Sequence, residues 1–293
     1  MSARALVTGH RGFTGKYVVD ELRASGFDVL TLTSDPYDET SAVIDLLDSD
    51  AVRGAIREVR PEVVIHLAAI AFVAHGSAEE MYRVNIVGTR NLLDALVGLA
   101  RIPKSILLAS SANVYGNVSV EVIDESVHPQ PANDYAVSKL AMEFMARTWM
   151  ERLPITIARP FNYTGVGQGE QFLLPKIVSH FKRGAEVIEL GNINVARDFQ
   201  DVRSVAAAYI RLVQAVTAGE TVNLCSGRSV SLSEVISMME VIAGRTIEVQ
   251  VNPAFVRGNE VARLTGSNAK LSHLVGPIEL IPLEQTLEWM FNA

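Results

Sequence analysis

Short apolar runs alternate with longer segments of helical periodicity through the first half of the chain. After an opening run at residues 4–8, further runs occupy residues 27–33, 62–69, 105–110 and 155–159. Apolar runs of this length are typical of strands that are buried on both faces of a parallel sheet. The alternation of strands and helices therefore predicts an α/β fold with a doubly wound parallel sheet.

The pattern changes after Pro160. Mixed loops and helices follow, with one more strand near Val222 and a final helix at residues 283–291. We find no internal repeat, low-complexity tract or linker. We therefore predict two lobes, a sheet lobe at residues 1–160 plus 200–226 and a smaller discontinuous lobe at 161–199 plus 227–293.

Composition limits the class of protein. The chain has 293 residues, of which 48% are hydrophobic, and its net charge of −7 argues against nucleic-acid binding. The longest apolar stretch, residues 63–74, is too short to cross a bilayer, and no signal peptide precedes Arg4. The lone Cys225 excludes an internal disulfide. We therefore expect a cytoplasmic protein with no membrane partner, and we predict no metal site.

A glycine-rich turn follows the first strand and leads into a long helical segment. A strand, a glycine turn and a helix start together place backbone N–H groups against a pyrophosphate, and glycines allow the phosphates to approach closely. We therefore predict a dinucleotide site that uses Gly9, Arg11, Gly12, Phe13, Thr14 and Gly15.

Tyr135 and Lys139 lie four positions apart in a predicted helix, with Ser111 upstream. This spacing puts both side chains on one helix face, where the Lys139 ammonium can favour the ionised Tyr135 phenol. Lowering the phenol pKa from about 10 to about 7 needs roughly 4 kcal/mol, which a cation and an oxidised nicotinamide supply only in a desolvated cleft. The set predicts carbonyl chemistry beside a nicotinamide cofactor.

These motifs resemble the extended short-chain dehydrogenase/reductases that act on nucleotide sugars, and the resemblance covers nearly the whole chain. Its other motifs are Asp45-Leu46, His66-Leu67-Ala68-Ala69, Tyr82-Arg83-Val84-Asn85, Ser110-Ser111-Ala112-Asn113-Val114-Tyr115-Gly116 and Tyr135-Ala136-Val137-Ser138-Lys139. The resemblance implies that the sheet lobe is a dinucleotide-binding Rossmann domain and that the smaller lobe binds the nucleotide sugar. It also implies a catalytic set of Ser111, Tyr135 and Lys139.

In that set, Ser111 would hydrogen-bond the sugar carbonyl, Tyr135 would donate the proton, and Lys139 would bind the nicotinamide ribose. Asn85 would brace the site, whereas His66 lies mid-strand and is expected to be a core histidine.

The resemblance extends the cofactor site beyond the glycine turn. Asp45, followed by Leu46, would accept from the adenine amine, although a helix cap explains Asp45 nearly as well. Ala68 and Ala69 would pass small side chains under the cofactor.

On the substrate side, the segments 158–162, 197–202 and 257–261 look most like those of the GDP-4-keto-6-deoxy-D-mannose reductases, which form GDP-D-rhamnose. Arginine suits a diphosphate because its fork donates two parallel hydrogen bonds. The residues implied on this side are Ser110, Asn162, Arg197, Arg257 and Glu260.

Two missing groups narrow the reaction. Dehydratases of this family carry an acid one or two places after the catalytic Ser or Thr, where this chain has Ala112 and Asn113. GDP-fucose synthases carry a cysteine at the position of Ala112. What remains is hydride transfer at C4, as net reduction of a 4-keto-6-deoxyhexose or as 4-epimerisation with tightly bound NAD. A non-catalytic dinucleotide-binding protein is a more remote alternative.

Cofactor choice turns on the end of the second strand. NAD-specific members of this fold place an acid there, and by alignment this chain has Thr33. Arg11 could reach the same ribose and bind a 2′-phosphate. Asp35 counts against this reading, because a shift of two residues would restore an acid. We therefore expect NADP(H), with NAD(H) possible.

Two helices are apolar on more than one face, which predicts a homodimer. They span residues 81–99 and 135–149, and family members often pair such helices across a dimer interface. The alternative is that both helices only pack within one subunit. The apolar residues concerned are Leu92, Leu93, Leu96, Leu140, Phe144 and Met145.

Overall fold

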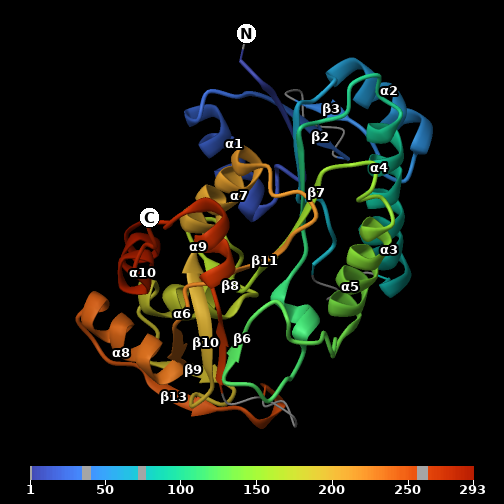
Figure 1. Ribbon diagram of the computed structural model, residues 1–293. Coiled ribbons are helices and arrows are strands. Elements are labelled where there is room, and N and C mark those ends of the chain that lie inside the picture. The colour runs from blue at the N-terminus through green and yellow to red at the C-terminus, as the bar shows by residue number, and fades with distance from the viewer. Residues whose placement is uncertain (1, 35–40, 72–76, 256–262) are drawn as a thin grey trace.

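A parallel sheet occupies the upper half of Figure 1, in a computed structural model that describes residues 2–34, 41–71, 77–255 and 263–293. It is seven-stranded, in the order β11-β7-β5-β4-β1-β2-β3, and every neighbouring pair is parallel. The chain extends the sheet first to one side of β1 and then to the other, so the predicted doubly wound α/β fold is confirmed. The bounds are β1 Arg4–Thr8, β2 Asp28–Thr33, β3 Ala42–Val43, β4 Val63–His66, β5 Ser105–Ala109, β7 Ile155–Pro160 and β11 Thr221–Leu224.

Helices cover both faces of this sheet, as the left and right sides of Figure 1 show. Successive strand residues point to opposite faces, so Leu6 packs under α2, α4 and α5, while Val7 packs under α1, α7 and α9. This two-sided burial explains the apolar runs in the sequence. No helix in the described ranges is both long and apolar enough to cross a membrane. The helix bounds are α1 Phe13–Ala24, α2 Ser49–Val59, α3 Ala78–Tyr82, α4 Thr89–Val97, α5 Asp134–Arg147, α7 Val202–Ala215 and α9 Ala269–Val275.

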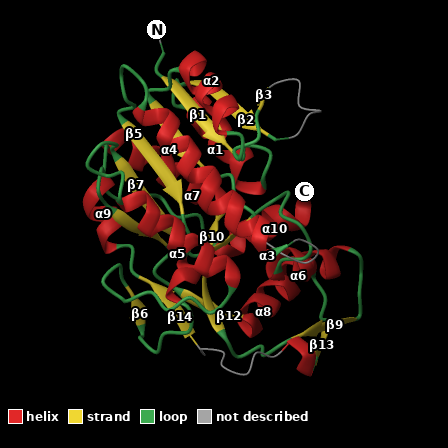
Figure 2. Ribbon diagram, turned by 90° about the vertical axis from the view of Figure 1, so that its right-hand side faces the viewer, coloured by secondary structure: helices red, strands yellow, loops and turns green. Residues whose placement is uncertain are grey.

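Two smaller sheets and three helices lie below the large sheet (Figure 2). One sheet has the order β12-β10-β14-β6, with β8 also paired to β10, and the other joins β13 to β9. The helices α6, α8 and α10 enclose a separate apolar core around Phe181, Val235 and Leu287. The bounds are β6 Val122–Ile123, β8 Asn162–Thr164, β9 Val187–Leu190, β10 Ala196–Asp201, β12 Ser229–Ser231, β13 Glu248–Val251, β14 Arg263–Gly266, α6 Leu173–Lys182, α8 Leu232–Ala243 and α10 Leu283–Asn292.

The chain passes between these two parts more often than the predicted lobe boundaries imply. β6 belongs by sequence to the first predicted lobe, yet it pairs with β14 in the second part. α9 belongs by sequence to the second lobe, yet its Leu271 packs into the core shared by α1 and α7. The division into lobes stays a prediction, and these two elements mark where a simple cut would separate packed residues.

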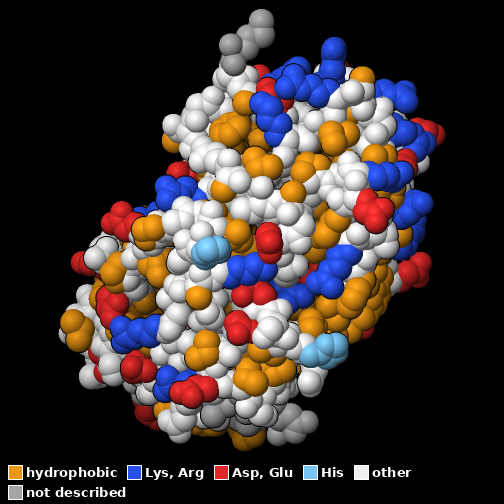
Figure 3. All heavy atoms as spheres, in the orientation of Figure 1, with side chains coloured by type: hydrophobic (Ala, Val, Ile, Leu, Met, Phe, Trp, Pro, Cys, Tyr) orange, Lys and Arg blue, Asp and Glu red, His pale blue; other side chains and the backbone are white. Residues whose placement is uncertain are grey.

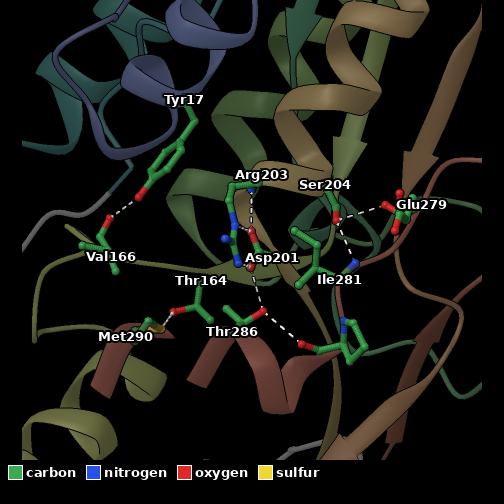
Figure 4. Close-up of polar contacts among 11 residues, drawn as sticks. Tyr17, Thr164, Val166, Asp201, Arg203, Ser204, Glu279, Ile281, Thr286 and Met290 are labelled. Atoms are coloured by element: carbon green, nitrogen blue, oxygen red, sulfur yellow. Dashed lines mark hydrogen bonds and ion pairs between the residues drawn. The ribbon is translucent and has the colours of Figure 1, made fainter. Parts of the chain in front are cut away.

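Polar contacts join the final helix to the start of α7, and join α1 to the loop after β8 (Figure 4). Asp201 caps α7 and binds Arg203 at 2.6 Å, and the Thr286 hydroxyl on α10 donates to the same carboxylate at 2.8 Å. The Tyr17 hydroxyl on α1 donates to the Val166 carbonyl at 2.6 Å. Because Asp201 is buried, its carboxylate needs these partners, and the contacts hold the two parts of the molecule together.

Candidate active site

The three predicted catalytic residues come from two neighbouring elements. Ser111 follows β5 and caps a short 3₁₀ helix, whereas Tyr135 and Lys139 lie on α5, which begins after the capping residue Asn133. The Ser111 hydroxyl lies near enough to the Tyr135 phenol to lower the pKa of that phenol. The Lys139 ammonium donates to the Ala109 carbonyl at the end of β5, at 2.7 Å. The fold therefore brings all three side chains to the carboxyl edge of the sheet.

Burial controls the protonation of this cluster. It raises the pKa of Tyr135 above the usual value, Tyr163 adds to that rise, and the nearby Ser111 hydroxyl opposes it. Burial also lowers the pKa of Lys139 to about 8, although Glu143 acts in the other direction. The sequence predicts a phenol pKa lowered by Lys139. In the structure this does not occur, because desolvation dominates and the ammonium is bonded to a backbone carbonyl.

His66 is a core histidine, as the sequence predicts. Its ring is buried at the end of β4 and is hydrogen-bonded on both nitrogens, to the Thr8 hydroxyl at 2.6 Å and to the Thr89 hydroxyl at 2.9 Å. Burial, with a smaller effect of Lys139, lowers its pKa to about 3. His66 therefore carries no charge at neutral pH.

The glycine turn is shaped for close backbone approach. Gly9 has φ of +73°, and a Cβ there would lie 2.6 Å from the backbone nitrogen of Ala68. A Cβ on Gly15 would lie 2.4 Å from the carbonyl oxygen of Gly9. Gly12 occupies the N-cap of α1 and has no side chain to bond the N–H groups of the first turn. These residues fit a dinucleotide pyrophosphate at the start of α1.

Tyr163 is a residue that the sequence reading missed. Its hydroxyl is 2.8 Å from the Thr14 hydroxyl, and its ring stacks on Phe13 with centroids 6.0 Å apart. It also raises the pKa of Tyr135, so it lies between the glycine turn and the catalytic cluster. The sequence signal that could have identified Tyr163 is its position directly after Asn162, a predicted substrate residue.

The glycine turn also lies beside the end of β2. His10 Nε2 is 3.1 Å from the Ser41 hydroxyl, and the Thr33 carbonyl accepts from the next strand segment at 2.6 Å. Arg11 is exposed on the same turn. Asp35, the acid that would reverse the cofactor prediction, lies outside the described residues.

Other predicted cofactor contacts are placed as follows. Asp45 is exposed in a turn and accepts from a backbone N–H at 2.9 Å, while Asp48 is the residue that caps α2. The helix-cap explanation for Asp45 is therefore wrong, and its carboxylate lies on the surface. Leu46 is buried, whereas Ala68 and Ala69 are partly exposed just after β4.

Asn85 joins this segment to the catalytic helix. Its side-chain amide exchanges two hydrogen bonds with the Ile70 backbone and donates to the Ser138 hydroxyl at 2.9 Å. The Ser138 hydroxyl also donates to the Tyr135 carbonyl. The contact is the bracing that the sequence predicts.

The predicted substrate residues fall into three groups. Asn162 is exposed on β8 and donates to the Asp198 carbonyl at 3.3 Å, and Arg197 lies on the neighbouring strand β10. Arg257 and Glu260 lie outside the described residues. The third group is Ser110, whose hydroxyl is bonded to Glu143.

Ser110 is buried, and its hydroxyl donates to the Glu143 carboxylate at 2.5 Å. Its hydroxyl is thus engaged beneath the catalytic cluster and is not available to a sugar in this conformation.

Sequence comparisons place this geometry among known proteins. Residues 5–225 match the NAD dependent epimerase/dehydratase family. The chain is 34% identical to a GDP-6-deoxy-D-talose 4-dehydrogenase of Aggregatibacter actinomycetemcomitans, over 93% of this chain and 91% of that protein. It is 35% identical to a GDP-6-deoxy-D-mannose reductase of Pseudomonas aeruginosa, over 98% and 95%.

Solved structures agree with the fold. A protein of Burkholderia cenocepacia J2315, provisionally described as an epimerase, has a TM-score of 0.94 at 53% identity and covers 99% of this chain and 97% of its own. RMD from Pseudomonas aeruginosa complexed with NADPH has a TM-score of 0.87 at 34% identity, with coverage of 100% and 97%.

Proposed function

The chain belongs to the NAD dependent epimerase/dehydratase family, and we propose that it reduces the C4 keto group of a GDP-linked 4-keto-6-deoxyhexose with NADPH. It is an NAD(P)-dependent nucleotide-sugar oxidoreductase. The observation that carries the proposal is the contact between Ser111 and a Tyr135 phenol whose pKa is raised. Two relatives named for GDP-6-deoxyhexoses support the substrate class.

Reduction needs a proton donor and an oriented carbonyl. NADPH, when bound, supplies the hydride. Ser111 would donate a hydrogen bond to the keto oxygen, and the protonated Tyr135 would transfer its proton there as negative charge develops. Lys139 would hold the nicotinamide ribose and stabilise the phenolate that results.

The substrate diphosphate would lie against Asn162 and Arg197, which come from the paired strands β8 and β10. Arginine and amide donors suit phosphate oxygens. Arg257 and Glu260 lie outside the described residues, and only the resemblance of their segment supports a role for them in binding the nucleotide. Ala112 and Asn113 carry no acid beside Ser111, so the chain lacks the group that a dehydratase uses there.

A nucleotide-sugar 4-epimerase is the second candidate, favoured by the description of the Burkholderia cenocepacia structure. An epimerase must keep its nicotinamide, because the hydride returns to the same sugar. We expect the purified protein to release its cofactor during gel filtration in the presence of competing nucleotide. Retention of one NAD per subunit through that step would favour the epimerase.

Replacing Arg11 with alanine should reduce the preference for NADPH over NADH about tenfold, since a charge-assisted bond to the 2′-phosphate is lost. Cofactor fluorescence titrations of both nucleotides measure the ratio. Arg23→Ala, which removes an exposed arginine at the far end of α1, is the matched control. An unchanged ratio in Arg11→Ala, or tighter binding of NADH by the unaltered protein, would rule out the proposed role.

A homodimer through α5 is the proposed assembly. Three of the apolar residues on which the dimer prediction rests cannot contact a partner. Leu92, Leu93 and Leu96 are buried in the core of the single chain. Exposed apolar side chains remain at Phe144 and Val137 on α5, on the side of the molecule where hydrophobic atoms gather in Figure 3.

Phe144→Asp should therefore convert the protein to a monomer, because it places a charge in an apolar contact. Sedimentation at micromolar concentration measures the mass. Val241→Asp is the control, since Val241 is 84% exposed on α8, a helix of the second part. A monomeric mass for the unaltered protein would remove the proposal.

A further inference from the structure

A buried ion pair lies directly beneath the catalytic cluster. Glu143 on α5 and Arg159 on β7 are both almost fully buried, and the guanidinium binds both carboxylate oxygens, at 2.9 Å from Nε and 2.6 Å from Nη2. Although burial opposes its charge, the bonds to Glu143 raise the pKa of Arg159 above its usual value. Removing either member of the pair would leave the other unpaired in the protein interior.

The pair holds both ends of the segment that carries Ser111. The Ser110 hydroxyl, one residue before it, donates to Glu143 at 2.5 Å. At the other end, Arg159 Nη1 donates to the Tyr115 hydroxyl at 3.0 Å, and the guanidinium lies 4.9 Å from the centre of the Tyr115 ring.

The same pair holds the helix that carries the other two catalytic residues. Glu143 lies one helical turn after Lys139 and two turns after Tyr135, so all three share a face of α5. Lys139 adds a parallel tie to the end of β5 through its bond to the Ala109 carbonyl. Contacts from one face of α5 thus fix residues 109 and 110 against the catalytic helix, and Arg159 on β7 holds Tyr115 at the far end of the segment.

We propose that Glu143 and Arg159 are positioning residues that set the distance between Ser111 and the Tyr135–Lys139 pair. The inference rests on the proposed function only in the identity of the catalytic set. Reductase and 4-epimerase reactions both use that set, so the inference can be tested with whichever nucleotide sugar the enzyme turns over.

Charge around Lys139 decides the expected pH response. The titratable groups near it are Tyr135 and Glu143 on its own helix and His66 on β4, with Arg159 on β7 behind Glu143. His66 is neutral in the working range. Glu143 is the group that favours the ammonium, so its neutralisation lowers the pKa of Lys139 and moves the alkaline fall of kcat to lower pH.

Three variants test the inference. Glu143→Gln keeps the shape of the side chain but removes its charge, and we expect kcat to fall about 100-fold, as a misplacement of catalytic groups by about 1 Å does. We also expect the alkaline limb of the kcat–pH profile of this variant to shift to lower pH. Ser110→Ala leaves the ion pair in place and should lower kcat less, with an unshifted alkaline limb. Combining the two should add little, because both break one network.

Thr156→Val is the matched control. Thr156 is buried at the opposite end of β7 from Arg159, and its hydroxyl donates to the Thr217 carbonyl at 2.6 Å. Its loss should lower Tm without changing kcat or the pH profile. If Glu143→Gln and Ser110→Ala also lower Tm without changing kcat or the pH profile, the ion pair only stabilises the fold and the inference is overturned. If the unaltered enzyme rejects GDP sugars but turns over another nucleotide sugar, only the proposed substrate fails.

Discussion

Tyr135→Phe is expected to lower kcat by about 100- to 10,000-fold, the range that a general acid contributes, while NADPH affinity stays within several-fold. The change removes only the phenolic hydroxyl, which the structure places in contact with Ser111. Burial raises the pKa of Tyr135, so the phenol keeps its proton at neutral pH and can act as the donor. Steady-state turnover and cofactor titration measure the two quantities.

Tyr82→Phe is the control for that experiment. The Tyr82 hydroxyl donates to Asp134 at 2.9 Å at the exposed start of the same helix, so this variant also removes one phenolic hydroxyl near α5. It should retain nearly full activity. A Tyr135→Phe enzyme with half the normal turnover would contradict the catalytic assignment.

Gly15→Ala should weaken NADPH binding by at least about 100-fold, because the glycine turn must deform to admit a side chain. The new Cβ would lie 2.4 Å from the Gly9 carbonyl oxygen and from the His10 Cα, and backbone atoms cannot move aside as a flexible side chain does. Cofactor titration measures the loss, and Tm reports whether the fold survives.

Gly54→Ala is its matched control. Gly54 lies within α2, where a Cβ meets no atom within 4 Å, and alanine favours a helix. It should bind NADPH normally and unfold at an equal or higher temperature. Normal cofactor affinity in a folded Gly15→Ala protein would remove the glycine turn from the cofactor site.

Local sequence patterns predict much of this fold. The runs at 105–110 and 155–159 correspond closely to β5 and β7, because strands buried on two faces favour apolar residues. The run at 27–33 corresponds to β2, which is mostly half-buried. The run at 62–69 is longer than β4, which ends at His66 where the chain turns past Gly9. The placement of Tyr135 and Lys139 on one helix also follows from local spacing.

Features that depend on tertiary packing could not be predicted from local sequence patterns. The apolar face of α4 indicates burial but does not say against what, and its leucines are covered by the protein's own sheet. The partners of Glu143 lie 16 and 33 residues away in sequence, on β7 and directly after β5. The pKa of Tyr135 depends on how deeply the fold buries the phenol, which no motif records.

The most direct test of the central claim is to incubate the purified protein with GDP-4-keto-6-deoxy-D-mannose and NADPH while following nicotinamide absorbance and sugar products. The account predicts that one NADPH is oxidised for each keto sugar reduced, giving a GDP-6-deoxyhexose that Tyr135→Phe hardly forms. The relatives named for 6-deoxy-D-mannose and 6-deoxy-D-talose suggest the two products to separate. Unchanged NADPH with the keto sugar recovered intact, together with C4 epimerisation of a saturated nucleotide sugar, would contradict the claim.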